Sequence, residues 1–458
     1  MSSRPSQAPP KPASSPKRRP RGGAGLAWQP RQRLVIAESA EKAKTLRACL
    51  GDGFLVMAAG CPVKKLADTD PGASAEAAAV IPYEPRKGSK RRLRQIQQAA
   101  RQAEAVYLAT DPGAEGELTA SHLAAELEGA RPGGGPRVYR VSLPEISADA
   151  VRRAIHAPAL VNARLADSWR ARQILERLIT LRIAPPLQRH LRRPLPLILT
   201  AVAAMDLIAG RERAITAFRP TGAWTVEVRL QASGQPQITA LLVGADDQPM
   251  EFTDQEAARA AVEVLRKAEF RITSVRRAEI SIDPPPPFTT STLIQDAFDR
   301  CGLPASRTLA AARQLYEGIE LKGGGASGLI TFPRTESVRV PEQAAAAARA
   351  LIAGRFGDAW LAPLPAAAGR MRPDAEAIRP VSVERTPESV EDLLDGDQRK
   401  LYRLIWQRFI ASRMAAARWE RATVEIEARG PASPRRRLVA TGVTPRFDGF
   451  RVIHGSLL

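Results

Sequence analysis

The sequence contains few of the side chains that build disulfide or zinc frameworks. It has three cysteines and four histidines among 458 residues, and neither type recurs at a paired spacing. The cysteines are Cys49, Cys61 and Cys301. A scattered, odd-numbered set of this kind argues against a disulfide scaffold and against a zinc ribbon. Any metal ion would therefore be held by carboxylates.

Long apolar runs are also missing. The chain has no stretch of about eighteen or more consecutive apolar residues, and its N-terminus lacks the apolar core of a secretory signal. We therefore expect no membrane span, no membrane partner and no secretion, and we predict a cytoplasmic protein.

Acidic residues are outnumbered. The chain has 68 lysines and arginines against 48 aspartates and glutamates, a formal net charge of +20. This excess favours a polyanionic partner such as nucleic acid. Residues 1–32 contain no acidic residue and are rich in Pro, Ser, Arg and Gly, so we predict a disordered basic tail. Its charge favours a nonspecific DNA tether, and a solubilising leader is the alternative.

A chain of this length exceeds what one hydrophobic core usually organises, so we expect two to four domains. In residues 33–160, apolar strands alternate with helical patterns, which predicts a parallel α/β sheet. Glu38 follows the first strand, residues 33–37, and Asp111 follows a later strand, residues 106–109. Polar sites of such sheets gather beyond the carboxyl ends of the strands, so these two acids are expected to meet.

The rest of the chain predicts four further segments. Residues 161–217 have helical periodicity and are rich in arginine, residues 218–284 alternate as strands, and consecutive prolines from Pro284 to Pro287 mark a linker. Residues 285–418 are again helical, with an amphipathic helix over residues 397–412, and residues 419–458 return as strands, one of them continuing from Gly442 to Val452.

One short segment carries a specific resemblance. Residues 328–337 read Gly-Leu-Ile-Thr-Phe-Pro-Arg-Thr-Glu-Ser and resemble the active-site motif of type IA DNA topoisomerases, in which the fifth residue is the nucleophilic tyrosine. Here that residue is Phe332. The stretches 287–293 and 314–318 resemble further elements of the family at the expected distance, and the resemblance covers most of residues 33–458.

The resemblance implies a TOPRIM domain at residues 33–160. Residues 38–45 and 109–117 are similar to its two motifs, so the family pattern assigns catalytic roles to Glu38 and Lys42 and Mg²⁺ binding to Glu38, Asp111 and Glu115. The family needs no ATP. The second aspartate of the motif is Gly113 here, and its loss removes a ligand and a charge from the shell of a hard cation. We therefore expect weak Mg²⁺ binding, or only a solvated cluster of acids.

The resemblance also assigns DNA contacts. Arg172 and Arg177 match the family's arginine helix, and Arg334 matches the arginine that contacts the scissile phosphate. Arg379 lies in a stretch similar to the family's His-Glu-Ala-Ile-Arg-Pro motif, although Ala375 replaces the histidine. We prefer a structural ion pair of Arg379 with Glu376. The apolar residues 196–202 stand where the family has a DNA-contacting loop, so that contact is expected to be lost.

The predicted fold is a multidomain α/β, helical and β arrangement: a TOPRIM domain followed by the helical and β-arch domains of an incomplete type IA topoisomerase toroid. Family members continue into further helices, so we expect an open arc that a protein partner or a second copy covers.

A phenyl ring has no oxygen with which to attack phosphorus. We therefore predict a protein that binds DNA, preferably single-stranded, at the nucleoid and has lost strand cleavage. One alternative is an active topoisomerase with an unidentified nucleophile, and another is a noncatalytic structural or regulatory arc. Gly113, Ala114, Ala375 and Cys61, which replaces a family histidine, also depart from the pattern, and several independent departures point to natural decay.

Overall fold

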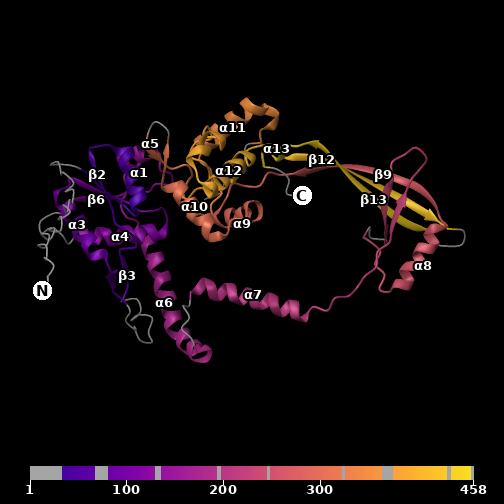
Figure 1. Cartoon of the computed structure of the whole chain (residues 1–458), viewed down its shortest axis with the longest axis horizontal. Helices are drawn as coiled ribbons and strands as arrows, with labels where there is room; N and C mark the ends of the chain where they lie inside the picture. Colours follow the sequence, from indigo (N-terminus) through magenta and orange to yellow (C-terminus); the bar gives the residue numbers. More distant parts are fainter. Residues whose placement is uncertain are drawn as a thin grey trace, which may run out of the picture.

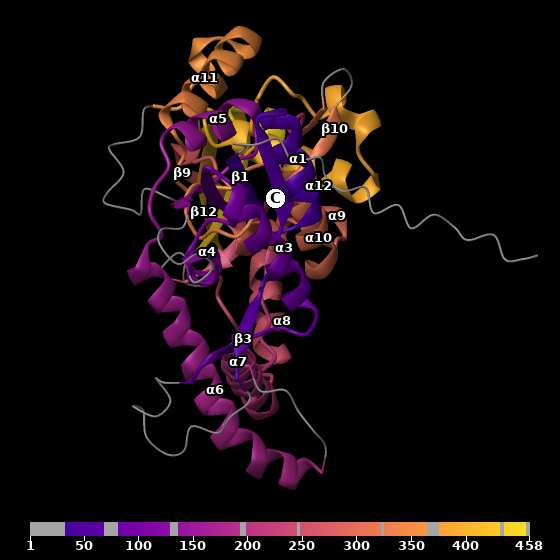
Figure 2. The same ribbon diagram turned by 90° about the vertical axis from the view of Figure 1, so that its left-hand side faces the viewer.

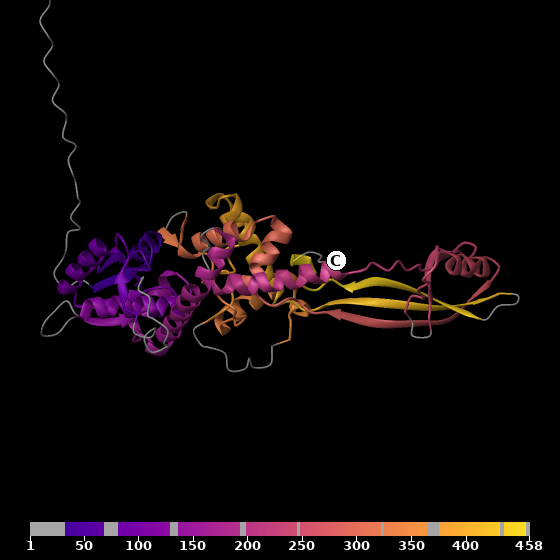
Figure 3. The same cartoon turned by 90° about the horizontal axis from the view of Figure 1, so that it is seen from below.

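A computed structural model describes eight parts of the chain: residues 33–67, 81–128, 136–192, 198–244, 248–321, 325–363, 375–430 and 435–454. The predicted basic tail, residues 1–32, lies outside them. An α/β region occupies one end of the molecule, a group of helices the centre, and a sheet with long strands the other end (Figure 1). The view from below shows the same elongated arrangement (Figure 3).

The N-terminal region contains a four-stranded sheet in the order β2-β1-β5-β6, with all neighbours parallel. The strands are β1 Arg33–Ala37, β2 Phe54–Ala58, β5 Ala105–Ala109 and β6 Arg137–Arg140. Helices α1 Ala40–Leu50 and α5 Ala148–His156 share a core with one face, and α3 Ser89–Gln102 and α4 Ala114–Glu128 share a core with the other. Because both faces are covered, β5 is buried along its whole length. The parallel sheet predicted for this region is confirmed.

Two helices leave the sheet region. Helix α6, Ala163–Leu191, packs beside α4 and then extends away from it, and α7, Leu199–Ala217, runs toward the far sheet (Figure 1). The described residues of α7 beyond Leu199 are all exposed. The end of the apolar stretch 196–202, which stands where the family has a DNA-contacting loop, forms the start of α7 from Leu199, because a run rich in alanine, leucine and methionine favours a helix. Residues 193–197 lie outside the described chain.

The far sheet is antiparallel, in the order β7-β8-β13-β12-β9. Its strands are β7 Glu227–Leu230, β8 Ile238–Val243, β9 Glu269–Ile282, β12 Ala417–Arg429 and β13 Arg436–Phe447. Helix α8, Gln255–Arg266, contributes Ala261 and Leu265 to a core with this sheet. The strands predicted within residues 218–284 are β7, β8 and the 14-residue β9.

The central helices are α9 Thr290–Cys301, α10 Ala305–Glu317, α11 Glu342–Phe356 and α12 Gly396–Ala411, with short helical turns η1 Asp358–Trp360 and η2 Glu388–Leu393. The predicted amphipathic helix is confirmed as α12, which buries Leu401, Tyr402 and Phe409. The short hairpin of β10 Ile319–Leu321 and β11 Gly325–Ser327 lies against α1. Figure 1 shows the central helices beside the N-terminal region, and Figure 2 views the molecule from the N-terminal side.

The strand predicted to continue to Val452 is wrong at its end. Strand β13 stops at Phe447, and α13, Arg451–His454, follows. The turn between them contains Gly449 at a φ of 49°, in the left-handed region that favours glycine. A Cβ atom there would lie 2.5 Å from the carbonyl oxygen of Ala415, so the close approach of two backbones ends the strand.

None of the described helices combines the length and the apolar composition that a membrane-spanning helix needs.

Candidate nucleic-acid interface

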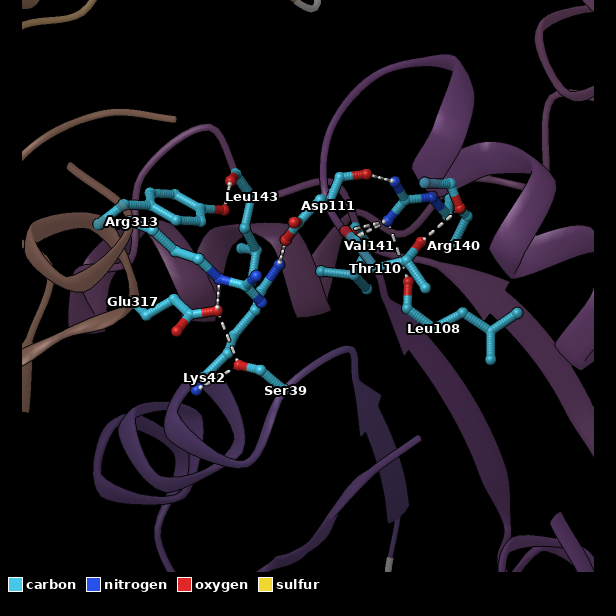
Figure 4. A network of polar contacts seen from close by, with 12 residues as sticks. Ser39, Lys42, Leu108, Thr110, Asp111, Arg140, Val141, Leu143, Arg313 and Glu317 are labelled. Atoms are coloured by element: carbon cyan, nitrogen blue, oxygen red, sulfur yellow. Dashed lines mark hydrogen bonds and ion pairs between the residues drawn. The ribbon is translucent and has the colours of Figure 1, made fainter. Parts of the chain in front are cut away.

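The predicted meeting of Glu38 and Asp111 occurs at the carboxyl ends of β1 and β5. These two strands are neighbours in the sheet, so the residues that follow them face each other. Lys42, on the first turn of α1, reaches between them, and its Nζ lies 2.7 Å from Asp111 Oδ1. The Lys42 side chain is fully buried. Figure 4 shows this contact beside the loop that follows β5.

The charges at this strand end are unevenly divided. Burial, the charge of Asp111 and a hydrogen bond with Asp111 raise the pKa of Glu38 to about 7. Burial acts in the same direction on Asp111, but the Lys42 ammonium and the Glu38 hydrogen bond outweigh it and hold the pKa of Asp111 below its usual value. Burial opposes the charge of Lys42, and its anionic neighbours nevertheless raise its pKa. Asp111 thus carries the negative charge, and Glu38 holds a proton into the neutral range.

Arg140 fixes the backbone that presents Asp111. Its Nε lies 2.7 Å from Glu117 Oε1, and its terminal nitrogens donate to the carbonyl oxygens of Leu108, Thr110 and Asp111 (Figure 4). The Arg140 side chain is 2% exposed. Sequence reasoning missed this residue, because its partners are mostly backbone carbonyl oxygens. Arg140 bonds three carbonyl groups at the end of β5 and therefore limits where Asp111 can move.

The glycine that departs from the family motif fits its own turn. Gly113 has a φ of 92°, a conformation that side chains other than glycine rarely adopt. Three residues later, a Cβ atom on Gly116 would lie 1.8 Å from the carbonyl oxygen of Asp111. The turn between β5 and α4 is therefore built on two glycines, and Gly113 supplies no ligand to it.

The three predicted metal ligands are not brought together. Glu115 turns to Arg334, with Glu115 Oε2 and Arg334 Nη1 3.0 Å apart, while Glu38 and Asp111 share Lys42. Among the described residues, no three acidic, histidine or cysteine side chains are grouped as metal ligands. Burial and the charges of Glu38 and Asp111 also raise the pKa of the neighbouring Cys61, so its thiol stays protonated.

This donor set does not fit Mg²⁺. The ion requires several oxygen ligands in near-octahedral geometry, and the site offers one charged carboxylate that already contacts an ammonium group and one protonated carboxyl. Lys42 contacts Asp111 and Arg334 contacts Glu115, so the weak Mg²⁺ binding predicted for Glu38, Asp111 and Glu115 stays a prediction that this arrangement disfavours.

Phe332 lies in the irregular segment after β11, at the boundary with the N-terminal region. Its amide nitrogen donates to the carbonyl oxygen of Pro144 at 2.8 Å, and its ring is partly buried in the core that both regions share. Arg334, two residues on, is 67% exposed and reaches Glu115. The structure thus places Phe332 and Arg334 against the N-terminal region, where their partners Pro144 and Glu115 lie far from them in sequence.

Tyr316 is the tyrosine beside Phe332, and its hydroxyl is already engaged. It donates to the carbonyl oxygen of Leu143 at 2.6 Å, and the residue is 1% exposed. Burial raises the pKa of Tyr316. A neutral phenol that is enclosed and bonded to a carbonyl is a poor nucleophile, which argues against Tyr316 as a substitute for the missing tyrosine.

A second polar contact joins the two regions at α10. Ser39 Oγ donates to Glu317 Oε1 at 2.8 Å, and Arg313 Nε donates to the same oxygen at 3.0 Å (Figure 4). Ser39 also accepts from the backbone of Lys42 as the N-cap of α1. Ser39 therefore both caps α1 and binds α10 of the central helices.

Arg379 is enclosed rather than presented to solvent. Its side chain is 6% exposed, and its Nη2 lies 2.9 Å from Glu376 Oε2 and 3.0 Å from Glu145 Oε2. The preferred structural pairing with Glu376 is confirmed. Because two carboxylates already neutralise this guanidinium, this arrangement disfavours the DNA contact predicted for Arg379.

The two arginines predicted on the helical segment have different surroundings. Arg172 is exposed on α6, stacks over Trp169 at 4.9 Å and lies 3.2 Å from Glu176. Arg177 lines a cavity of about 320 Å³ between α6, α4 and the short strand β3, Lys64–Leu66. The cavity wall mixes basic, aromatic, amide and acidic side chains, chiefly Lys64, Arg86, Trp169, Gln173 and Arg177, with the acids Glu115 and Glu176.

His122 forms part of the same cavity wall. Its ring lies 4.3 Å from the ring of Tyr83, and burial together with the charges of Lys64 and Arg170 lowers its pKa to about 4. His122 is therefore neutral at physiological pH, and the positive charge of the cavity comes from its lysines and arginines. Such a wall suits bases and phosphates of a nucleic-acid strand.

Comparison with known proteins decides the family. A family model described as DNA topoisomerase matches residues 161–457, and a model of the Toprim domain matches residues 33–146. The chain belongs to the type IA DNA topoisomerase family. Among solved structures, full-length topoisomerase I from Thermotoga maritima is similar at 29% identity and a TM-score of 0.78, over 93% of this chain and 68% of that one.

The predicted fold class is thereby confirmed. The parallel sheet of this topoisomerase family member is a Toprim domain, and helices and antiparallel strands follow it. Toprim domains are a magnesium-binding fold. The Toprim domain of this chain differs from that description, because Lys42 neutralises its carboxyl pair.

Proposed function

We propose that this type IA topoisomerase family protein binds single-stranded DNA and does not cleave it. The observation that carries the proposal is Phe332, which occupies the position of the family's nucleophile with a ring that has no oxygen. Covalent attack on a phosphodiester needs such an oxygen. The bonded and buried hydroxyl of Tyr316 leaves no substitute beside it.

The basic cavity supports the binding half of the proposal. Arg177 and Arg86 line it, Trp169 offers a stacking surface, and Arg334 stands exposed near the strand ends. Phosphate contacts supply affinity and aromatic stacking holds bases without sequence preference. Arg172, Arg177 and Arg334 are therefore the proposed DNA ligands, and Arg379 is not among them.

The carboxyl site supports the loss of chemistry. A protonated Glu38 and an Asp111 paired with Lys42 do not provide the charge-stabilising environment that transesterification at phosphorus requires. We therefore assign Glu38 and Lys42 structural roles.

We also propose the division of the chain into domains predicted above, with boundaries near residues 160, 217, 284 and 418. The proposed location is the nucleoid in the cytoplasm, where chromosomal DNA is found.

The test compares wild type with Phe332→Tyr. Relaxation of negatively supercoiled plasmid with Mg²⁺ and binding of a labelled single-stranded oligonucleotide are measured side by side. Phe298→Tyr is the matched control, since it adds the same hydroxyl at a side chain that is 61% exposed. We expect all three proteins to bind the oligonucleotide and none to relax the plasmid. Relaxation by wild type would overturn the proposal, and relaxation by Phe332→Tyr would show that the carboxyl site is competent.

One observation favours a second candidate, a noncatalytic protein-binding scaffold. Helix α7 exposes Met205, Leu207 and Ile208 at 68%, 76% and 61%, a larger apolar surface than isolated helices usually present to water. A protein interface there would persist at high salt, whereas DNA binding would fall steeply. Sedimentation of the protein alone at low and high salt distinguishes the two.

A further inference from the structure

The region around helix α3 concentrates positive charge. Residues 86–101 contain seven cationic residues and no acidic one. The cationic residues are Arg86, Lys87, Lys90, Arg91, Arg92, Arg94 and Arg101. All are exposed, and Arg92 is turned toward the fold, where its Nη1 donates to the carbonyl oxygen of Ala59. Apart from Arg86, which lines the cavity, none of these residues has a role in the function proposed above.

Helical geometry collects these charges on one side. Positions 90, 91, 94 and 101 fall within about 100° of one another around a helix of 3.6 residues per turn, and Lys87 precedes them in the turn before α3. The opposite side carries Leu93, Ile96 and Ala100, at most 4% exposed. We call Lys87, Lys90, Arg91 and Arg94 the α3 basic face.

Nearby acids do not neutralise the α3 basic face. Glu126 lies 2.8 Å from Lys64, Glu84 lies 3.1 Å from Lys65, and Glu104 lies 4.0 Å from Arg33. Across the described part of the chain, no ion pair joins a carboxylate to any of the four residues of the face. Like charges three or four residues apart destabilise a helix by about 0.2–0.5 kcal/mol per pair. A bound anion would therefore reduce the repulsion among the four cations of the α3 basic face.

The α3 basic face begins at the cavity. Arg86 lines the cavity together with Arg177, and Lys87 is the next residue along the chain. A strand that leaves the cavity past Arg86 therefore meets Lys87, Lys90, Arg91 and Arg94 in sequence. Lysine and arginine spaced by about 6 Å of helix rise can reach successive phosphates of such a strand.

The same geometry disfavours a lipid surface. Amphipathic helices that bind membranes insert their apolar side into the interface, but the apolar side of α3 is packed in the core of the N-terminal domain. Only the charged side is available, and it suits a sugar-phosphate backbone, which offers regularly spaced phosphates.

We propose that the α3 basic face is a second DNA-binding surface, which holds the backbone of the strand that leaves the cavity past Arg86. This inference rests on the proposed function, since it extends the path of the DNA bound there. It predicts that affinity depends on strand length, because a short strand fills the cavity alone and a longer one also reaches α3.

The test removes the charges and varies the length. The variant Lys87→Gln/Lys90→Gln/Arg91→Gln/Arg94→Gln keeps good helix formers on α3. The control Arg259→Gln/Arg266→Gln/Lys267→Gln/Arg271→Gln removes the same number of exposed charges at and beside α8, in the far sheet region. Both are titrated with labelled single strands of about 8 and about 30 nucleotides over a range of salt. Circular dichroism checks that helix content matches wild type.

We expect the α3 variant to lose about tenfold or more in affinity for the long strand, with the slope of log K against log salt reduced by up to about 3, and to keep wild-type affinity for the short strand. The control should resemble wild type with both strands. Equal losses in the two variants, or none in the α3 variant, would overturn the inference and leave the proposed function standing. Failure of wild type to bind either strand would overturn both.

A lipid arm completes the test. Wild type and the α3 variant are sedimented with phosphatidylserine vesicles. If wild type binds the vesicles, the α3 variant does not, and the long-strand affinity is unchanged, the α3 basic face is a lipid surface and the DNA assignment is wrong.

Discussion

The ring of Phe332 packs edge-on against the ring of Tyr316, with centroids 5.2 Å apart and planes inclined by 68°. Both residues also bond the same short segment of the Toprim domain, Tyr316 through its hydroxyl to Leu143 and Phe332 through its amide to Pro144. Such an aromatic pair contributes about 0.5–1.5 kcal/mol beyond its buried area. The residue that we propose to occupy the family's nucleophile position therefore takes part in a packed contact between two regions of the chain.

The Tyr316 hydroxyl gives the first prediction. Tyr316→Phe keeps the ring contact with Phe332 but leaves the buried carbonyl oxygen of Leu143 without its donor. We expect the free energy of unfolding in urea to fall by about 1–3 kcal/mol. Tyr139→Phe, whose ring stacks on Tyr107, is the control and should change it by less than about 0.5 kcal/mol. An equal effect of the two substitutions would mean that the Tyr316 hydrogen bond contributes nothing.

Local sequence pattern predicted the core of the fold well. The strand at residues 105–109 is apolar throughout, which is typical of a parallel strand buried on both faces, and the polar residues after two such strands met as expected. Glu38 and Asp111 could be placed together because strand order follows from simple βα topology. Helix α12 was equally accessible, since its apolar spacing and its N-cap Asp395 lie in one short stretch.

Pairings between distant segments could not be predicted. Whether Glu115 binds a metal or Arg334 depends on how two regions dock, and whether Arg379 faces DNA or Glu145 depends on burial. Arg140 was missed because its partners are mostly backbone carbonyls, which carry no sequence signal. The charges of α3 are visible in the sequence, but their isolation from acids is a property of the surrounding fold.

The buried cation gives the second prediction. Lys42→Met removes the ammonium group between Glu38 and Asp111 and leaves two carboxyls in a poorly solvated site. Breaking a buried ion pair costs about 3–5 kcal/mol, so we expect a loss of this size in the free energy of unfolding. The control is Lys44→Met on the same helix, where the partner Glu320 is 75% exposed and stability should stay close to wild type. Similar stability of the two variants would contradict the structural role of Lys42.

The proton on Glu38 gives the third prediction. Its pKa rises from the ordinary 4.5 to about 7 on folding, so the folded state holds this proton more tightly than the unfolded state. The resulting stabilisation is complete below about pH 4.5 and is lost as the pH rises through about 7, a change of about 3 kcal/mol. Glu38→Gln keeps a hydrogen-bond donor for Asp111 and cannot ionise. Its free energy of unfolding should therefore exceed that of wild type above pH 7.

The measurement compares the two proteins by urea unfolding between pH 5 and pH 8. Their difference isolates Glu38, because the buried His122 and His454, whose pKa values are lowered to about 4, titrate in both proteins. Asp149→Asn, at an exposed carboxylate, controls for the loss of one acidic group. A difference that stays constant with pH would show that Glu38 is already ionised in the folded state.

The Arg334–Glu115 pair gives the fourth prediction, with opposite effects from its two members. Arg334→Ala removes an exposed cation and should weaken single-stranded DNA binding by about fivefold to tenfold, with the salt slope lowered by about 0.7. Glu115→Gln removes the carboxylate that occupies the Arg334 guanidinium at 3.0 Å, so it should strengthen binding and steepen the slope. Arg229→Ala, an exposed arginine of β7 paired with Glu227, should change neither. If both members of the pair shift affinity in the same direction, the guanidinium is not released to phosphate, and the DNA path lies away from Phe332.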